Sequence, residues 1–438
     1  EHCSFLCFLL APFYWINPDP LMLQYFKLAA FFSGSYIFFL ILKKRLHPVI
    51  ALLGMVAYTV APANVGMLQF SFNYEPFAIP LIFLIFKAFD EKKYVLYMVS
   101  LFLLAMVKEQ MPLVVVSFGV FAFIFRKEDR FKWAVIPLMM GLAIFIVEVF
   151  FFIPYFRKDL PVQQVYYWAR YAQFGSNPQE ILIYLLTHPL KVFEQFIHPT
   201  NLQWYNDLFG IWGGIALFSP HLMLPAAPLF LKTIFSNTAI ERMVGLYYYA
   251  SIFTPFLFLA ALNTLHHIHN KWRIHLHSVA LVAMFFHALV FLPSWLGALQ
   301  LGPMGGMANK LAAQRMINQI PPGASVLAGD SLLAPLANRK GIYTFSAYLL
   351  DYYEVSGLPF VLPKDVEYLL LNYADEYILL EEKNRHLLPK ITKLNFDNHW
   401  RLKESIEDIA LYVTNKEQTP SFRLIEKNTK PFLAENTK

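Results

Sequence analysis

Charged side chains are scarce in this sequence of 438 residues. Asp, Glu, Lys and Arg make up 15% of it, whereas soluble domains carry about 25%. Hydrophobic residues make up 57%, and they gather in long apolar runs of the kind that cross a hydrocarbon core about 30 Å thick. The shortage of charge excludes an ordinary soluble protein and predicts an α-helical polytopic membrane protein.

Cysteine and the usual catalytic motifs are also nearly absent. The only two cysteines, Cys3 and Cys7, lie one helical turn apart, which excludes a disulfide framework and does not favour a metal site. No GxSxG, HExxH or Walker loop is present, so the sequence lacks the usual signatures of soluble-type hydrolases, proteases and NTPases. The net charge of +6 comes from short basic clusters and does not indicate nucleic acid. A divalent metal cofactor is unsupported but stays open.

The apolar runs predict about ten transmembrane helices. The seventh and eighth runs are short and contain Pro220, Pro225 and Pro228, which predicts a broken helical hairpin. Basic clusters at 43–47, 90–93, 126–132 and 266–275 fall on one side, which the positive-inside rule makes cytoplasmic. The ten runs are 23–42, 48–66, 76–89, 94–108, 111–126, 133–153, 208–219, 221–235, 248–264 and 276–295.

Charge density roughly doubles after residue 300. We therefore expect a membrane domain over 1–299 and a small extracytoplasmic α/β domain over 300–438 that ends in a disordered-like tail. Residues 309–320 form an amphipathic helical pattern that two prolines stop. Short β-like runs follow, which predicts a small mixed sheet; they are 325–329, 341–346, 367–372 and 376–382. The first residue is Glu1 rather than Met, so we expect the natural N-terminus to lie upstream.

Lys108 and Glu109 are the only charges in the run from 94 to 125. Adjacent helical positions point about 100° apart, so the two do not pair with each other. One interpretation is a solvated turn; the other is a functional site, because charge at membrane depth is costly. Glu75 precedes Pro76 on the same outer side, where the helix dipole alone would favour a carboxylate. We predict that Glu75, Lys108 and Glu109 line one outward-facing polar cavity.

The segment 154–207 is aromatic and polar, and part of it has the helical periodicity of a segment lying flat on the outer leaflet. Its aromatic group, Tyr166, Tyr167, Trp168 and Tyr171, fits membrane anchors better than a saccharide platform. Arg170 fits either a lipid headgroup or a substrate phosphate. Glu148, near the outer end of the sixth run, is expected to reach the interface by snorkelling.

Several stretches together resemble a known family. In order they are "FNYEPFAIPLIFL", "LLAMVKEQMPLVVVSFGVFAFIFR", "LFGIWGGIALFSPHLMLPAAPLFLKTIFSN" and "IPPGASVLAGDSLLAPLANRKGIYTFS". They resemble uncharacterised prokaryotic polytopic proteins, catalogued as predicted membrane proteins of unknown function, which are in turn similar to C-type (GT-C) glycosyltransferases. The resemblance covers most of the chain and implies a GT-C-like fold in the cytoplasmic membrane.

The chain departs from that family at two places. Ser71, Asn73 and Tyr74 stand where the family has Asp, His and Pro, and Gln110 stands where it has Asp. The family also has a first span and the start of an outer loop ahead of the Glu-His pair that matches Glu1 and His2. In C-type glycosyltransferases this loop carries the catalytic acid.

Two functions remain open. The first is an enzyme that moves a sugar from a polyprenyl-phosphate donor to an acceptor on the extracytoplasmic side, with membrane lipid and the lipid-linked sugar as its partners. Such a reaction needs a base and positive charge near the leaving phosphate. The alternative is a non-enzymatic transporter or flippase, which the broken helix pair favours. The base candidates are Glu75, Glu109 and Glu1, and the substrate-binding candidates are Lys108, Arg170, Arg242, Tyr248 and His2.

Overall fold

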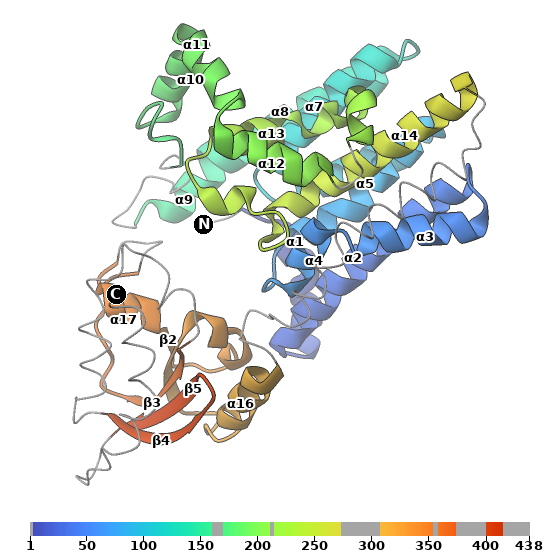
Figure 1. The fold of residues 1–438 in the computed structure, drawn as a ribbon. Coiled ribbons are helices and arrows are strands. Elements are labelled where there is room, and N and C mark those ends of the chain that lie inside the picture. The colour runs from blue at the N-terminus through green and yellow to red at the C-terminus, as the bar shows by residue number, and fades with distance from the viewer. Residues whose placement is uncertain are drawn as a thin grey trace. The chain divides into compact units, whose positions relative to one another are not determined.

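The computed structural model describes residues 3–159, 170–210, 214–272, 307–353, 358–373 and 400–414. The chain forms two compact units, Glu1–Gln300 and Leu301–Lys438. Helices make up the first unit, and a sheet with short helices makes up the second (Figure 1). The expected combination of a helical apolar part and a small C-terminal sheet is therefore confirmed.

Proline begins many helices of the first unit. At the first helical position proline lacks only a donor that has no intrahelical partner, and its fixed φ suits a helix start. Pro20, Pro48, Pro62, Pro178 and Pro199 all occupy this position. The α-helices are α1 (Leu6–Ile16), α2 (Pro20–Lys43), α3 (Pro48–Thr59), α4 (Pro62–Gln69), α5 (Glu75–Asp90), α6 (Tyr94–Ala105), α7 (Met111–Phe125), α8 (Ile136–Ile146), α9 (Ile153–Arg157), α10 (Pro178–Thr187), α11 (Pro189–Phe196), α12 (Pro199–Phe209), α13 (Ala227–Phe235) and α14 (Thr254–Trp272).

The expected number of about ten spans is not confirmed. In the described part of the chain, three helical runs are long and apolar enough to cross a membrane: Pro20–Lys43, Phe131–Arg157 and Tyr248–Ile268. The α3–α4 pair, bent by 55°, adds a fourth if it counts as one span. Helices α6 and α7 have 12 and 15 residues, fewer than the roughly 20 that a span needs. The tenth expected span, 276–295, lies outside the described residues.

The predicted break at Pro220 and Pro225 is present in the described residues 214–235. Two 3₁₀ helices, Ile215–Phe218 and Pro220–Ala226, precede the nine-residue α13. Proline lacks a backbone donor, so Pro220 and Pro225 prevent a continuous α-helix here. The segment is joined to α14 through Ser219, whose Oγ lies 2.7 Å from Thr264 Oγ1.

Aromatic side chains fill the core between α2, α3, α5 and α14. Tyr58 is fully buried and contacts Phe38 of α2, Phe83 of α5 and Phe258 of α14, with ring centroids 4.9–5.3 Å apart. Its hydroxyl accepts a hydrogen bond from Thr254 Oγ1 at 3.3 Å. This satisfies the polar end of a ring that brings four helices together.

Helix α4 touches a distant turn through two glycines. A Cβ atom on Gly66 would lie 2.5 Å from the backbone oxygen of Gly245, which is too close for any side chain. Gly245 itself has φ +88°, in the left-handed region that glycine adopts without strain. The contact brings α4 beside the chain that runs from the 3₁₀ helix Ala239–Arg242 to Tyr248.

In its described residues, the second unit contains a five-stranded mixed sheet of order β2-β1-β3-β5-β4. Strand β1 (Ser325–Ala328) is parallel to both β2 (Ile342–Thr344) and β3 (Val366–Asn372). Strand β5 (Ile409–Thr414) is antiparallel to β3 and to β4 (Trp400–Ile406). Among the described residues, helix α16 (Met307–Ile317) and the short α17 (Phe345–Leu350) belong to the same unit. The expected strand at 376–382 lies outside the described residues.

Candidate functional site

Glu75 and Lys108 form a buried ion pair. Glu75 is the first residue of α5, where the helix dipole favours a carboxylate, and Lys108 lies in the turn between α6 and α7. Lys108 Nζ is 2.6 Å from Glu75 Oε1, and the side chains are 5% and 2% exposed. Their predicted proximity is confirmed. The solvated-turn interpretation is wrong for Lys108, because its side chain lies against Glu75 and the ring of Tyr248 instead of in water. Lys108 Nζ is 5.4 Å from the centre of that ring.

Lys27 secures the chain that leads to Glu75. This buried lysine of α2 donates to the backbone oxygens of Phe70 at 2.7 Å and Leu68 at 3.2 Å, at the C-terminal end of α4. A positive charge is favourable there because the carbonyls at a helix C-terminus carry partial negative charge. Lys27 is not among the predicted site residues, although it is the one charge inside the apolar run 20–42.

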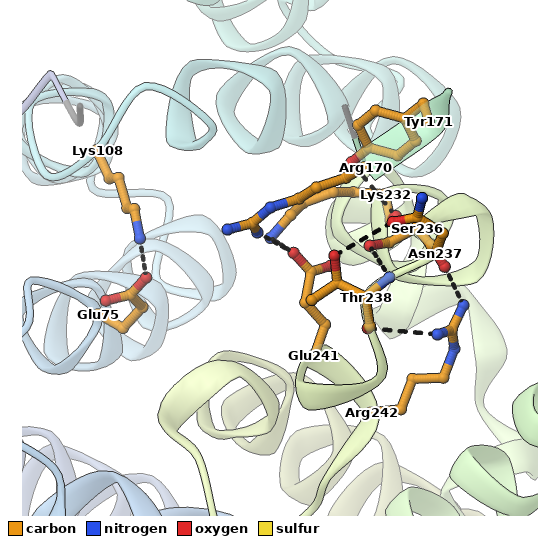
Figure 2. Close-up of polar contacts among 10 residues, drawn as sticks. All are labelled: Glu75, Lys108, Arg170, Tyr171, Lys232, Ser236, Asn237, Thr238, Glu241 and Arg242. Carbon is orange, nitrogen blue, oxygen red and sulfur yellow. Dashed lines mark hydrogen bonds and ion pairs between the residues drawn. The ribbon is translucent and has the colours of Figure 1, made fainter. Parts of the chain in front are cut away.

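A second buried group is centred on Glu241. Its side chain is fully buried and pairs with Arg170, and Lys232 Nζ of α13 lies 3.5 Å from its Oε1. Figure 2 shows Arg170 and Lys232 extending side by side toward this carboxylate. Burial disfavours the charge on Arg170, but Glu241 outweighs that effect and raises the pKa of the guanidinium. Arg170 is among the predicted site residues, whereas Glu241 and Lys232 are not.

Two tyrosines connect the ion pairs. The rings of Tyr248 and Tyr249 lie 4.2 Å apart, with Lys108 over the first and Lys232 Nζ 5.3 Å from the centre of the second. We call Glu75, Lys108, Arg170, Lys232 and Glu241 the charged cluster. It holds three cations and two carboxylates, so its formal charge is +1.

A small pocket opens within the charged cluster. Glu75, Lys232 and Tyr249 contribute to its wall, and its interior has room for about one water molecule. Glu75 Oε2 is buried and has no hydrogen-bond partner in the part of the chain that the structure describes. One carboxylate oxygen is thus held by Lys108 while the other remains available to accept a proton or a hydrogen bond.

Arg242 turns away from the charged cluster. Its Nε donates to Asn201 Oδ1 at 2.6 Å, and its terminal nitrogens donate to the backbone oxygens of Ile234, Ser236 and Thr238. Figure 2 shows the guanidinium directed at this loop rather than at Glu241. Arg242 therefore has a structural role here, and its substrate contact remains a prediction.

The other predicted residues are distributed as follows. Glu109 is partly exposed and accepts a hydrogen bond from the backbone N–H of Cys3 at 3.1 Å. Tyr171 donates to the backbone oxygen of Lys232 at 3.4 Å. Among the described residues, no group of three or more His, Cys, Asp or Glu side chains is placed to hold a metal ion. Glu1, His2, Tyr166, Tyr167 and Trp168 lie outside the described residues.

Comparison with known proteins places the chain in context. A family profile described as "Predicted membrane protein (DUF2079)" matches residues 1–411. No curated protein matches the sequence. Together with the long apolar helices, the profile match supports a location in a membrane.

Proposed function

We propose a function for this chain, which belongs to the family of predicted membrane proteins DUF2079. Its charged cluster binds the phosphate of a lipid-linked sugar. The protein then transfers the sugar to an acceptor. A polyprenyl-phosphate donor suits a membrane protein, since its lipid tail stays in the bilayer while its phosphate sits at the surface. The reaction is that of a C-type glycosyltransferase.

The excess positive charge of the cluster carries this proposal. Burying charge is costly, and a structural pair needs only one cation for each carboxylate. Here Arg170 and Lys232 share the single carboxylate Glu241. When a sugar leaves, its phosphate gains a second negative charge, and preorganised cations in a protected site stabilise that change.

The two cations on Glu241 are better placed to meet a phosphate than Lys108 is. The side chains of Lys232 and Arg170 are 26% and 14% exposed, and Lys108 is almost completely enclosed. The pocket holds about one water molecule, so a phosphate enters only as these two side chains swing away from Glu241. Lys108 then stays with Glu75 and fixes its orientation.

Glu75 is the base that this geometry favours. Glu75 lines the pocket, and its unpartnered Oε2 accepts the proton of the acceptor hydroxyl. The acceptor oxygen bonds to the anomeric carbon as the bond from that carbon to the phosphate oxygen breaks. The phosphate leaves with the electron pair. Glu109, partly exposed one residue after Lys108, is the second base candidate.

Binding of a short-chain polyprenyl phosphate tests the site directly. In full-length protein, Lys232→Ala removes a charge-assisted contact worth about 1.5–3 kcal/mol, so affinity should fall roughly 10- to 150-fold. The matched control is Lys191→Ala, since Lys191 pairs with Glu194 on an exposed helix face. Equal affinities for the two variants would refute the phosphate site.

Transfer itself is measured with a radiolabelled hexose on the same lipid phosphate and a lipid-rich membrane extract as the acceptor source. Glu75→Gln keeps the shape of the side chain and removes the base, so turnover should fall while lipid phosphate still binds. A parallel reaction with a chelator decides whether a divalent metal takes part. Unchanged turnover in Glu75→Gln would remove Glu75 from the mechanism.

A lipid-linked solute transporter is the second candidate. The broken segment from Ile215 to Phe235 favours it, because interrupted helices often line transport sites, and Asn263 and Thr264 of α14 meet it at Ser219. Reconstituted vesicles separate the two functions. Movement of a fluorescent lipid phosphate across the bilayer without sugar transfer supports the transporter.

We also propose that the C-terminal unit is extracytoplasmic, in the cell membrane orientation that the basic clusters predict. A cysteine at the exposed position Lys340, in a background without Cys3 and Cys7, reports its side. An impermeant maleimide should label it from outside the cell. Labelling only after the membrane is opened reverses the orientation.

A further inference from the structure

Glu148 is a buried carboxylic acid that sugar transfer does not use. It lies in the strongly apolar helical run Phe131–Arg157. Only 22% of the most apolar stretch of this run is buried inside the protein. Glu148 is nevertheless 1% exposed. The expectation that it snorkels to the interface is wrong, because the surrounding protein encloses its carboxyl group.

Neither oxygen of Glu148 has a hydrogen-bond partner in the described part of the chain. An ionised carboxylate in such surroundings costs several kcal/mol unless a cation or donors compensate it. No cation pairs with Glu148 among the described residues. The group therefore avoids the cost by keeping its proton.

The local backbone is also unusual. Residues Val147–Phe152 form a π-helical turn between α8 and α9. Such turns insert an extra residue into a helix and are frequent at functional sites. Together with the enclosed acid, the turn marks this part of the run as different from a simple lipid-facing span.

The N-terminal segment packs against this turn, since the ring centroid of Phe5 lies 5.1 Å from that of Phe152. Two titratable groups near it interact electrostatically with Glu148. Glu109, in the turn between α6 and α7, interacts electrostatically with it. Cys3, in the N-terminal segment, interacts with both acids and donates its backbone N–H to Glu109. Glu109 is partly exposed, so one acid of the pair reaches solvent and the other does not.

We infer that Glu148 is a proton-binding site that exchanges its proton with Glu109. The two side chains are not hydrogen-bonded in the structure, so the exchange takes place when a side-chain motion brings them within hydrogen-bond distance. The O–H bond of the Glu148 carboxyl then breaks, the Glu109 carboxylate takes the proton, and the negative charge moves inward. The ligand is a proton, and the route leads from solvent through Glu109 to an acid inside the membrane unit. Intramembrane acids are typical of proton relays. The inference is independent of sugar transfer, whose base is Glu75.

Infrared spectroscopy of the full-length protein in lipid tests the protonated state. A protonated carboxyl gives a C=O stretch apart from that of carboxylates, and at pH 7 Glu148→Gln should remove one such band. Glu128→Gln is the matched control, because Glu128 lies in an exposed ion pair with Lys92 and its loss should leave the band in place. Gln has nearly the shape of Glu, so both variants should fold.

Isotope exchange tests the route. In D₂O the Glu148 band should move to lower frequency within minutes, and Glu109→Gln should slow this shift at least tenfold. A band that never shifts would show a sealed structural acid, and a shift as fast in Glu109→Gln would exclude Glu109 as the relay. Absence of any band that depends on Glu148 would overturn the inference altogether.

Discussion

Lys108 Nζ lies 2.6 Å from Glu75 Oε1, although 33 residues separate them in the chain. Both side chains are buried, so each charge depends on the other. Removing one partner of a buried pair leaves an uncompensated charge, whereas removing both together does not. The pair is thus a structural element as well as the setting of the proposed base.

Lys108→Met should lower the free energy of unfolding by about 3–5 kcal/mol, the usual cost of stranding a buried charge. The double variant Lys108→Met/Glu75→Gln should recover most of that loss. Denaturation of the full-length protein in detergent measures both. Lys191→Met is the control and should change stability by less than about 1 kcal/mol, because its pair is exposed. A double variant no more stable than the single one would contradict this account of the pair.

Lys27→Met should loosen the chain between α4 and α5. The variant leaves the carbonyls of Leu68 and Phe70 without their donor, at a cost of roughly 1–3 kcal/mol. Hydrogen exchange should rise in residues 67–75 and stay unchanged in the C-terminal sheet. Lys27→Arg keeps a donor and should restore part of the protection. Unchanged exchange in Lys27→Met would show that the contact does not hold this segment.

Acid should weaken the junction of α2, α5 and α6 through Glu91. Hydrogen bonds from Lys44, Lys87 and Lys93 hold the pKa of the Glu91 carboxyl far below its usual range. The folded pKa is the lower one, so the stabilisation is complete above the unfolded value of about 4.3 and is lost as pH falls below it.

Thermal unfolding between pH 3 and 7 measures this effect. Glu91→Gln should lower the melting temperature near neutral pH and flatten its fall in acid. Glu128→Gln, at an exposed surface pair, should keep the wild-type profile. Parallel profiles for wild type and Glu91→Gln would exclude Glu91 as the group responsible.

The apolar face of α10 and α11 should contact lipid. Leu186 lies at the end of α10, Leu190 and Phe193 lie three residues apart on α11, and each of these side chains is more than 60% exposed. A spin label at Leu190 in reconstituted protein should be relaxed strongly by oxygen, which concentrates in lipid. A label at Glu194 should respond to a water-soluble nickel complex, since that side chain is also exposed. The opposite pattern would place this face in water.

The sequence predicted the Glu75–Lys108 contact because both residues are isolated charges in apolar surroundings, where each needs a partner. It did not predict Glu241 and Lys232. These residues flank the polar loop 236–240, and charges there look solvated until Arg170, far away in the chain, packs over them. Burial of this kind depends on long-range packing, which local pattern does not contain.

Local sequence pattern also failed to predict where some helices break and how two strands of the sheet pair. Hydropathy averages over many residues, so it did not register the break at Pro62 that divides the expected span 48–66, whereas the prolines themselves predicted the break at Pro220. Strands β1, β2 and β3 were predicted from short apolar runs. The β4–β5 hairpin was not predicted because its turn holds Glu407, at φ 51°, instead of the glycine or asparagine that signals such a turn.

The contact between Gly66 and Gly245 has a genetic consequence. One glycine belongs to α4, which leads to Glu75, and the other lies between Glu241 and Tyr248, so the spacing of the charged cluster depends on two positions without side chains. A single added methyl group on Gly66 would push these segments apart. A random-mutagenesis screen for inactive alleles should therefore recover alanine and serine at residue 66 as readily as changes of the charged residues themselves.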